Sequence, residues 1–308
     1  FNAGQLIEFI GYFTSIVWPI MAVSQLIEMR ARGKASLARI GELLDTPVDV
    51  ADKPTVKEPD APLSGNIEMR HLTFRYPGGS YDSLTDVSFK INAGENVGII
   101  GKTGSGKTTL VDLLLRTYNV PDGTVFLDGY DVNHLPIRTV RKYAAYVPQD
   151  NFLFSDTIAN NIAFASDTDD QSVIEEAARL SDVHDNITEF TEGYKTVLGE
   201  RGVTVSGGQK QRISIARALM KDANILILDD TLSAVDNVTE KRITEHLSGV
   251  LKDKTSIIIS HRLSALQEAD LILVLDDGEA VGLGVHTELL ETCPVYREIY
   301  ESQFEEVE

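Results

Sequence analysis

The sequence predicts an α/β protein with a mainly parallel, wound sheet, preceded by one membrane-spanning helix. Short apolar runs alternate with helical patterns along most of the chain, which is typical of wound α/β domains. A glycine-rich loop at 101–109 joins one such run to a helical pattern. A 19-residue uncharged segment near the start predicts the membrane helix.

Composition narrows the class of protein. The 308 residues are 43% hydrophobic and 24% charged, so a packed core is expected. The net charge of −19 argues against a general nucleic-acid binder, although a local phosphate pocket stays compatible with it. Cys293, the single cysteine, cannot form an internal disulfide. We interpret it as a small apolar residue in a reducing, cytoplasmic setting. Phe1 begins inside an apolar pattern, so we expect a piece of a longer protein.

The first expected element is a transmembrane helix with its cytoplasmic extension, over 1–44. Its segment Phe9–Ile27 carries no charge and is long enough to cross a bilayer. Four basic residues then follow closely: Arg30, Arg32, Lys34 and Arg39. This positive-inside pattern predicts that the C-terminal side faces the cytoplasm. From the segment alone, a long buried helix of a soluble domain remains the alternative.

A linker is expected at 45–65, where four prolines and little apolar pattern predict an extended, exposed chain. A soluble domain is then expected over 66–308. Its expected strands are IEMRHLTFRY, ENVGII, TVFLDG, AAYVPQ, NILILDD, TSIIIS and LILVL. Its expected helices cover Lys107–Tyr118, Gln171–Leu180, Gly208–Met220 and Val238–Leu251.

The stretch GKTGSGKTT, Gly101 to Thr109, matches the G-x-x-x-x-G-K-[ST] pattern between a strand and a helix. Its glycines let backbone N–H groups wrap phosphates, and the helix start favours negative charge. Lys107 is expected to neutralise the β- and γ-phosphates of ATP, and Thr108 to hold Mg²⁺. A glycine turn without a ligand is the alternative.

The stretch NILILDD, Asn224 to Asp230, predicts a buried parallel strand whose acids emerge at its C-terminal end. Asp229 is expected to hold Mg²⁺ directly or through water. Alone, it would equally suit a solvated acid at a strand end, but the phosphate loop upstream favours the metal-binding role.

Between these motifs lies TVSGGQKQRISIARAL, Thr204 to Leu219, which resembles the signature of the ATP-binding cassette (ABC) transporters. Other stretches agree in order and spacing with this family. They are FRYPGGS, YVPQD, GERG (with Glu200 and Arg201), LSAVD, IIISHRLSAL and HTELLETCPVYREIYESQ, the last resembling an exporter C-terminal helix pair. The resemblance covers nearly all of 66–303.

The resemblance implies a P-loop NTPase fold with an antiparallel β subdomain and an α-helical signature subdomain. It also implies the roles of the site residues. Tyr76 stacks on adenine, Gln149 approaches Mg²⁺ and the attacking water, and His261 contacts the γ-phosphate. The implied nucleotide-binding set is Tyr76, Gly101, Lys102, Thr103, Gly104, Ser105, Gly106, Lys107, Thr108, Thr109, Ser206, Gly207, Gly208, Gln209 and Asp236. The implied catalytic set is Asp230, His261 and Gln149, and the metal set is Thr108, Gln149 and Asp229.

For three of these residues the chain itself leaves plainer alternatives: Tyr76 as a strand aromatic, Gln149 as a surface glutamine, and His261 as a core histidine. The SGGQ stretch, Ser206 to Gln209, stands at a helix start, where Ser206 would also serve as a simple cap. In the family it reaches ATP held by a second cassette, so two cassettes meet head to tail around two ATPs.

Asp230 departs from the family pattern, which usually places glutamate after the strand-end aspartate. Aspartate is shorter, and a misplacement of about 1 Å can cost on the order of 10²-fold in rate. We therefore expect a site that binds MgATP well and splits it slowly, beside a non-identical partner that bears the glutamate. This resembles heterodimeric bacterial exporters, often multidrug exporters.

The sequence thus indicates a membrane exporter subunit that couples ATP binding and hydrolysis to export. The expected substrates are drugs or other amphipathic small molecules, and the expected place is the cell membrane with the cassette on the cytoplasmic face. Nucleic acid is not an expected partner. Two alternatives stay open: a homodimeric exporter with Asp230 as a working base, and a soluble ABC ATPase.

Overall fold

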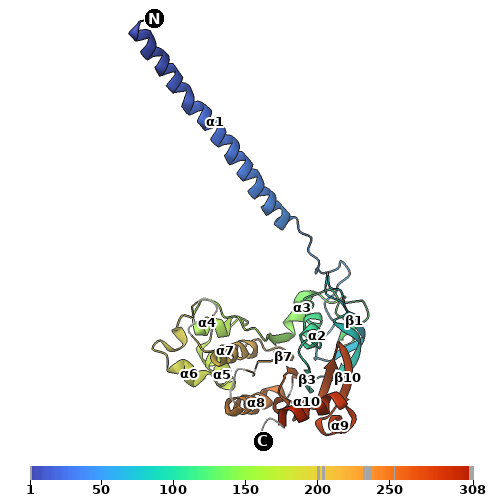
Figure 1. The fold of residues 1–308 in the computed structure, drawn as a ribbon. Helices are drawn as coiled ribbons and strands as arrows, with labels where there is room; N and C mark the ends of the chain where they lie inside the picture. The colour runs from blue at the N-terminus through green and yellow to red at the C-terminus, as the bar shows by residue number, and fades with distance from the viewer. Residues whose placement is uncertain are drawn as a thin grey trace. The chain divides into compact units, whose positions relative to one another are not determined.

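The computed structural model describes residues 2–199, 202, 205–231, 233, 237–252 and 254–304. The chain divides into two compact units, Phe1–Asp49 and Val50–Glu308. The first unit is a helix, and the second is a domain of sheets and helices (Figure 1).

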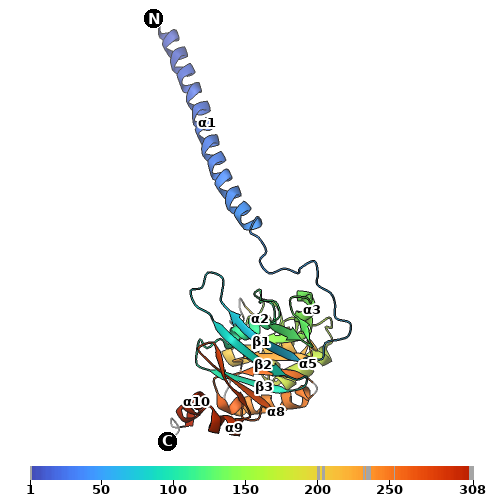
Figure 2. The ribbon, with the colours of Figure 1, turned by 90° about the vertical axis from the view of Figure 1, so that its right-hand side faces the viewer.

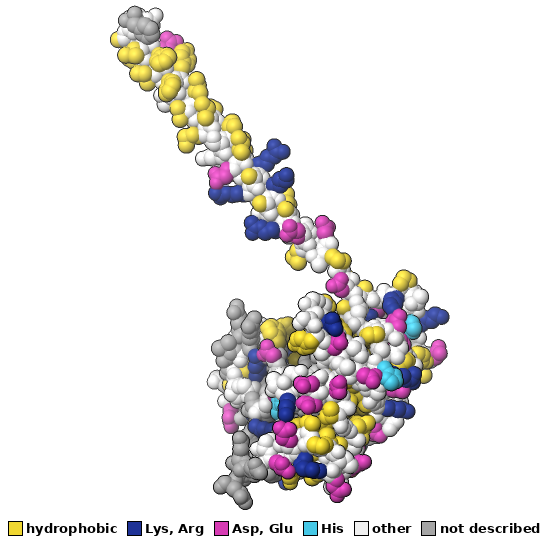
Figure 3. Space-filling view, turned by 45° about the vertical axis from the view of Figure 1, so that its right-hand side comes forward, with side chains coloured by type: hydrophobic (Ala, Val, Ile, Leu, Met, Phe, Trp, Pro, Cys, Tyr) yellow, Lys and Arg dark blue, Asp and Glu magenta, His cyan; other side chains and the backbone are white. Residues whose placement is uncertain are grey.

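The first unit holds helix α1 (Ala3–Leu44), which begins at a capping box formed by Asn2 and Gln5. Pro19 lies inside it, and none of its described residues is buried. At 1.5 Å per residue, its 42 residues reach about 63 Å, roughly twice the hydrocarbon thickness of a bilayer. Apolar side chains cover its first part and basic side chains follow (Figure 3). In the described part of the chain, α1 alone is long and apolar enough to cross a membrane.

The second unit is built on a six-stranded sheet of order β10-β9-β3-β8-β7-β6. Its strands β3, β6, β7, β8 and β9 run parallel, and β10 pairs antiparallel with β9. The bounds are β3 (Asn96–Gly101), β6 (Ala144–Val147), β7 (Ile225–Asp229), β8 (Thr255–Ile259), β9 (Leu271–Asp276) and β10 (Glu279–Gly284). Because parallel strands end at one edge, the residues after β3, β7 and β8 meet there.

A second sheet, of order β2-β1-β4-β5, is antiparallel throughout. Its bounds are β1 (Ile67–Phe74), β2 (Leu84–Ile91), β4 (Val125–Leu127) and β5 (Tyr130–Asp131). This sheet confirms the antiparallel subdomain that the resemblance implied.

Helices complete the domain, and α4 to α7 gather in one lobe (Figure 1). That lobe holds α4 (Ile158–Ala163), α5 (Gln171–Leu180), α6 (His184–Thr188), the 3-10 turn η1 (Gly193–Lys195) and α7 (Gly207–Leu219). The others are α2 (Lys107–Leu114), α3 (Ile137–Lys142), α8 (Asn237–Leu251), the 3-10 turn η3 (Leu263–Ala265), α9 (His286–Thr292) and α10 (Pro294–Phe304).

The strands of the larger sheet supply two cores because successive side chains point to opposite faces. On β7, Ile225 and Ile227 join the core shared with α2 and the smaller sheet. Leu226 and Leu228 join the core that holds α8, α9 and α10. Helix α2 lies on one side of the sheet, and α8, α9 and α10 lie on the other (Figure 2). A third core fills the helical lobe.

The segment from Val50 to the first strand is mostly exposed, yet it is tied to the domain near α3. Asp52 accepts a hydrogen bond from the Ile137 N–H at 2.8 Å. Glu58 accepts one from the Thr139 hydroxyl at 2.5 Å. The proline-rich stretch is therefore held along this helix by its acidic side chains.

The α/β fold expected from the sequence is confirmed, and the C-terminal helix pair appears as α9 and α10. The predicted helix Lys107–Tyr118 ends earlier, at Leu114, and the helix expected from Gly208 begins at Gly207. Strand β2, with its irregular register against β1, was not predicted. The short helices α3, α4 and α6 were not predicted either.

Candidate nucleotide-binding site

The loop between β3 and α2 needs glycine at two positions. A Cβ on Gly101 would lie 2.2 Å from the carbonyl oxygen of Leu275. Gly106 has a φ of 98°, and a Cβ there would lie 2.6 Å from Leu84. Since only glycine fits both conditions, the loop can run close to its neighbours and leave N–H groups at the start of α2 for a ligand.

Lys107, the first residue of α2, is buried beneath this loop. Its Nζ donates hydrogen bonds to the carbonyl oxygens of Gly101 and Lys102, each at 2.9 Å. Burial lowers the pKa of Lys107, while the nearby carboxylates of Asp229 and Asp230 act in the opposite direction. An anion bound in the loop would favour the charged ammonium.

A hydroxyl and a buried carboxylate meet beside this lysine. Thr108 Oγ1 donates to Asp229 Oδ2 at 2.9 Å, and the Tyr146 hydroxyl donates to the same oxygen at 3.2 Å. Asp229 is only 2% exposed. Burial, aided by the neighbouring Asp230, raises the pKa of Asp229 despite these hydrogen bonds. A nearby cation would therefore stabilise the ionised carboxylate.

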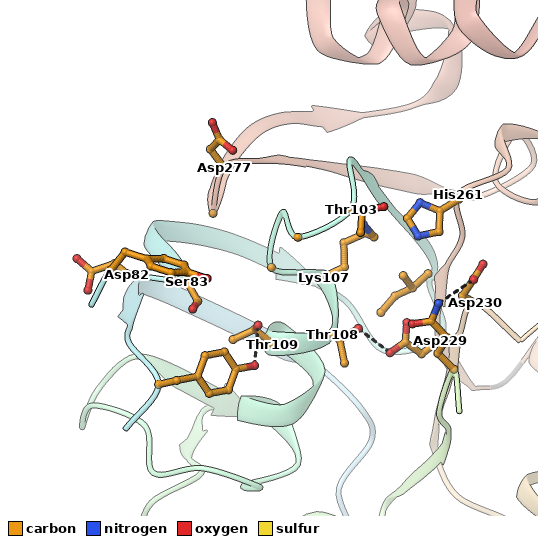
Figure 4. A pocket seen from close by; sticks show the side chains of 17 residues that line it. Asp82, Ser83, Thr103, Lys107, Thr108, Thr109, Asp229, Asp230, His261 and Asp277 are labelled. Atoms are coloured by element: carbon orange, nitrogen blue, oxygen red, sulfur yellow. Dashed lines mark hydrogen bonds between the residues drawn. The ribbon is translucent and has the colours of Figure 1, made fainter. Parts of the chain in front are cut away.

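Asp230 follows β7 and has a φ of 47°, a left-handed conformation that aspartate tolerates better than most residues. Its N–H donates to the Ile259 carbonyl at 2.9 Å. Its carboxylate accepts a hydrogen bond from Gln149 Nε2 at 3.2 Å. His261 follows the neighbouring strand β8, so it stands on the same side of the pocket as Asp230 (Figure 4).

At the other end of the pocket, the Tyr76 hydroxyl lies 2.9 Å from Thr109 Oγ1, within hydrogen-bonding distance. The Tyr76 ring packs edge-on against Phe74 and Tyr118, with centroids 5.1 and 5.0 Å away. Burial raises the pKa of Tyr76. The ring is thus fixed by the core and by α2 while it lines the pocket.

These side chains enclose one pocket of about 590 Å³ (Figure 4). The predicted site residues that line it are Tyr76, Thr103, Gly104, Gly106, Lys107, Thr108, Thr109, Gln149, Asp229, Asp230 and His261. Gly101, Lys102 and Ser105 belong to the same loop without lining the pocket. The structure therefore brings together predicted site residues that lie up to 185 positions apart, from Tyr76 to His261.

The signature residues Ser206, Gly207, Gly208 and Gln209 do not line this pocket. They form the start of α7, in the helical lobe. Ser206 Oγ accepts the Gln209 N–H at 3.2 Å, and Gln209 Oε1 accepts the Ser206 N–H at 2.9 Å. Asp236, Glu200 and Arg201 lie outside the described residues.

Sequence reasoning missed several lining residues. Tyr81, Asp82 and Ser83 come from the connection between β1 and β2, and Asp277 and Gly278 from the β9–β10 turn. No local pattern marks them, since long-range strand pairing brings them to the site. Tyr146, which donates a hydrogen bond to Asp229 without lining the pocket, was also missed, although its place in the YVPQD stretch offered a signal.

The pocket suits a nucleoside triphosphate with a divalent cation. A glycine-shaped loop and a buried lysine match phosphates. The hydroxyl of Thr108 and the carboxylate of Asp229 are the hard oxygen ligands that Mg²⁺ prefers, and Mg²⁺ commonly takes few protein ligands besides phosphates and water. The residues present thus fit the expected MgATP.

Comparison with known proteins agrees with this geometry. The family model described as ABC transporter matches residues 84–233. A probable multidrug resistance ABC transporter ATP-binding/permease protein of Bacillus subtilis is 45% identical over 305 residues, covering 97% of this chain and 51% of that protein. The ATP-dependent lipid A-core flippase of Escherichia coli K12 is 38% identical, covering 98% of this chain and 52% of that protein.

Among solved structures, a bacterial Atm1-family ABC exporter with ATP bound superposes with a TM-score of 0.85 at 34% identity. The match covers 98% of this chain and 53% of that one. This chain spans about half the length of the curated relatives it matches. The chain therefore contains an ATP-binding domain of the ABC transporter family, preceded by one long apolar helix.

Proposed function

We propose that this chain is the last membrane helix and the cassette of an ABC exporter subunit that binds and hydrolyses ATP. One observation carries the proposal: the buried Lys107 lies beneath a glycine-shaped loop, next to the Thr108–Asp229 pair. One pocket thus holds a positive charge that can bind phosphate and, beside it, oxygen atoms that can bind a cation.

Each residue has a separate role, which follows from its position in the pocket. Lys107 offsets the charge of the β- and γ-phosphates, and the N–H groups at the start of α2 bind their oxygens. Thr108 and Asp229 hold Mg²⁺, which neutralises phosphate charge when bound. Tyr76 faces the adenine, and His261 contacts the γ-phosphate.

Asp230 positions the attacking water poorly. A base must come within about 2.6–3.2 Å of the proton it takes, and aspartate is one methylene shorter than the glutamate usual in the family. Its carboxylate is also engaged by Gln149. We therefore propose slow hydrolysis at this chain's own site and faster turnover at the site of a non-identical partner.

The start of α7 serves that partner. Ser206 to Gln209 stand away from this chain's own pocket, which supports a role toward ATP held by a second cassette. ATP that touches both cassettes stabilises the closed pair, and loss of the γ-phosphate loosens it. This alternation would drive export.

We assign the helix to the cell membrane and the cassette to its cytoplasmic face. The apolar length of α1 and its basic flank support this assignment. The transported molecules are drugs or other amphipathic compounds. The relatives named above, a probable multidrug transporter and a lipid A-core flippase, support this class of substrate.

The proposal is tested with Lys107→Ala. Losing a charge-assisted contact to phosphate should weaken ATP binding by about ten- to a hundredfold. Photolabelling of this chain with an azido analogue of ATP, competed by ATP, measures the change. Lys90→Ala, which removes an exposed lysine of β2, is the matched control. Equal ATP affinity in Lys107→Ala and wild type would contradict the phosphate-binding role.

A further inference from the structure

The C-terminal helix α10 reaches the chain segment that carries His261. The side chain of Gln303, near the end of α10, makes two hydrogen bonds to this segment. Its Nε2 donates to the His261 carbonyl oxygen at 2.6 Å. Its Oε1 accepts the Leu263 N–H at 3.0 Å. One amide group thus bridges the main chain on both sides of Arg262.

The backbone N–H of Leu263 depends on its hydrogen bond to Gln303. Leu263 is the first residue of the 3-10 turn η3, so its N–H has no partner within the turn. The preceding residue, Arg262, provides no side-chain cap. Leu263 is fully buried, and a buried N–H without a partner is costly. Gln303 therefore acts as a cap supplied by a distant helix.

Gln303 is held in place by the packing of α10. Tyr296 is fully buried in the core beside the sheet, and Ile299 and Tyr300 pack against the same core. Gln303 follows them at helical spacing, so it lies on the same face of α10. The Tyr296 hydroxyl lies 2.7 Å from His286 Nδ1, which ties α10 to α9.

The opposite side of the segment is held through Arg262. Its Nη1 donates to Glu240 Oε2 on α8 at 2.8 Å, and its Nη2 donates to the Ser233 carbonyl at 3.1 Å. The segment is thus clamped between α8 and α10. The side chain of His261 is exposed to the pocket while the backbone that carries it is fixed.

A second contact links α10 to the site, but it is weaker. Lys102 of the phosphate loop pairs with Glu298 at 3.3 Å, and both side chains are more than half exposed. Exposed ion pairs of this kind contribute little to the stability of a protein. The bridge from Gln303 is therefore the contact through which α10 acts on the site.

We propose that Gln303 is a positioning residue, which fixes the backbone of His261 so that its imidazole meets the γ-phosphate of bound ATP. The proposal rests on the proposed role of His261. It gives the C-terminal helix a part in distinguishing ATP from ADP, because only ATP carries the phosphate that His261 contacts. Loss of the bridge should leave the rest of the nucleotide site unchanged.

The test compares ATP with ADP at this chain's own site in the full-length protein. Photolabelling of this chain by an azido nucleotide, competed by MgATP or MgADP on ice, gives both affinities. Gln303→Met keeps the side-chain length and removes both hydrogen bonds. Gln303→Glu keeps the acceptor for Leu263 and removes the donor to His261. Glu301→Gln, on an exposed residue of the same helix, is the control.

We expect the preference for ATP over ADP to fall about two- to tenfold in Gln303→Met and Gln303→Glu, with ADP affinity unchanged. Unchanged ADP affinity also shows that the variants are folded. His261→Ala should reduce the preference similarly, and adding Gln303→Met to it should bring no further loss, because the two residues act through one contact.

Two results would overturn the assignment of Gln303 alone: a normal ATP preference in both Gln303 variants while His261→Ala loses it, or a further loss in the double variant. Equal loss of ATP and ADP affinity in the Gln303 variants would also overturn it, since α10 would then support the whole site. If His261→Ala keeps the full preference, the proposed role of His261 fails first and the assignment of Gln303 falls with it.

Discussion

At the scale of single residues, the site holds one carboxyl group, that of Asp229, whose ionised form is disfavoured by its surroundings. Burial raises the pKa of Asp229 above that of the unfolded chain. The folded protein then binds more protons than the unfolded chain, so stability falls as pH rises through this range and the cost persists at neutral pH. This loss of stability applies to the nucleotide-free state, because a bound cation would stabilise the ionised carboxylate.

Asp229→Asn should therefore raise the melting temperature of the nucleotide-free protein at neutral pH. The difference from wild type should shrink as pH falls toward about 3.9, the ordinary pKa of aspartate, and vanish below it, where the carboxyl is uncharged in both the folded and the unfolded chain. The same variant should gain less stability from MgATP than wild type does. Differential scanning fluorimetry across pH, with and without MgATP, measures both effects. A lower melting temperature at neutral pH would mean that the hydrogen bonds from Thr108 and Tyr146 need the charge.

At the scale of elements, the start of α7 combines a structural role and a proposed functional role in one residue, Ser206. Ser206 caps the helix, and its removal in Ser206→Ala should cost about 1 kcal/mol of stability. Ser206→Asp keeps a capping oxygen but adds a negative charge. That charge should repel the ATP of the partner and suppress turnover of the assembled transporter, while the melting temperature stays near that of wild type.

Comparing the two variants separates the roles of Ser206. Nucleotide affinity of this chain's own pocket should stay unchanged in both, because Ser206 does not line it. Full turnover with Ser206→Asp would show that no phosphate approaches this helix start.

Helix α1 allows a test of the membrane assignment. Cys293 is 3% exposed, so thiol reagents should give a low background from this chain. Ile16→Cys, within the uncharged segment, should resist a membrane-impermeant maleimide in membranes and react in detergent. Ala35→Cys, within the basic flank, should react in inside-out vesicles. Equal labelling of the two positions in membranes would contradict a spanning segment.

Elements with strong local patterns were predictable, and those set by distant contacts were not. All five residues of β7, four of them apolar, are buried, as a parallel strand within a sheet requires. Strand β2 escaped prediction because Asp86, with a φ of 52°, interrupts its pattern, and its register against β1 shifts twice. Likewise, Gln303 gave no signal by itself, since its partners lie 40 and 42 residues away.

At the scale of the whole molecule, the proposed function predicts that ATP is hydrolysed mainly at the site of the proposed partner and only slowly at this chain's own site. Asp230 lines the pocket and accepts a hydrogen bond from Gln149. Its neighbours Lys107, Thr108, Asp229 and His261 line the same pocket. Binding and hydrolysis should therefore separate: the pocket should hold MgATP firmly, whereas the shortened carboxylate should slow the chemical step.

Asp230→Asn should consequently change the steady-state ATPase rate of the assembled transporter only modestly. Replacing the catalytic glutamate that we propose for the partner with glutamine should remove most of it, because general-base assistance contributes on the order of 10²–10⁴-fold at a competent site. Measuring both variants in one preparation, with photolabelling of this chain to confirm ATP binding, makes the comparison internal. Asp230→Glu is the less decisive change, since glutamate tolerates the φ of 47° less well than aspartate. If Asp230→Asn instead abolishes hydrolysis while the partner variant stays active, Asp230 is a working base. A homodimeric pump, with two such sites, then becomes the better account of this chain.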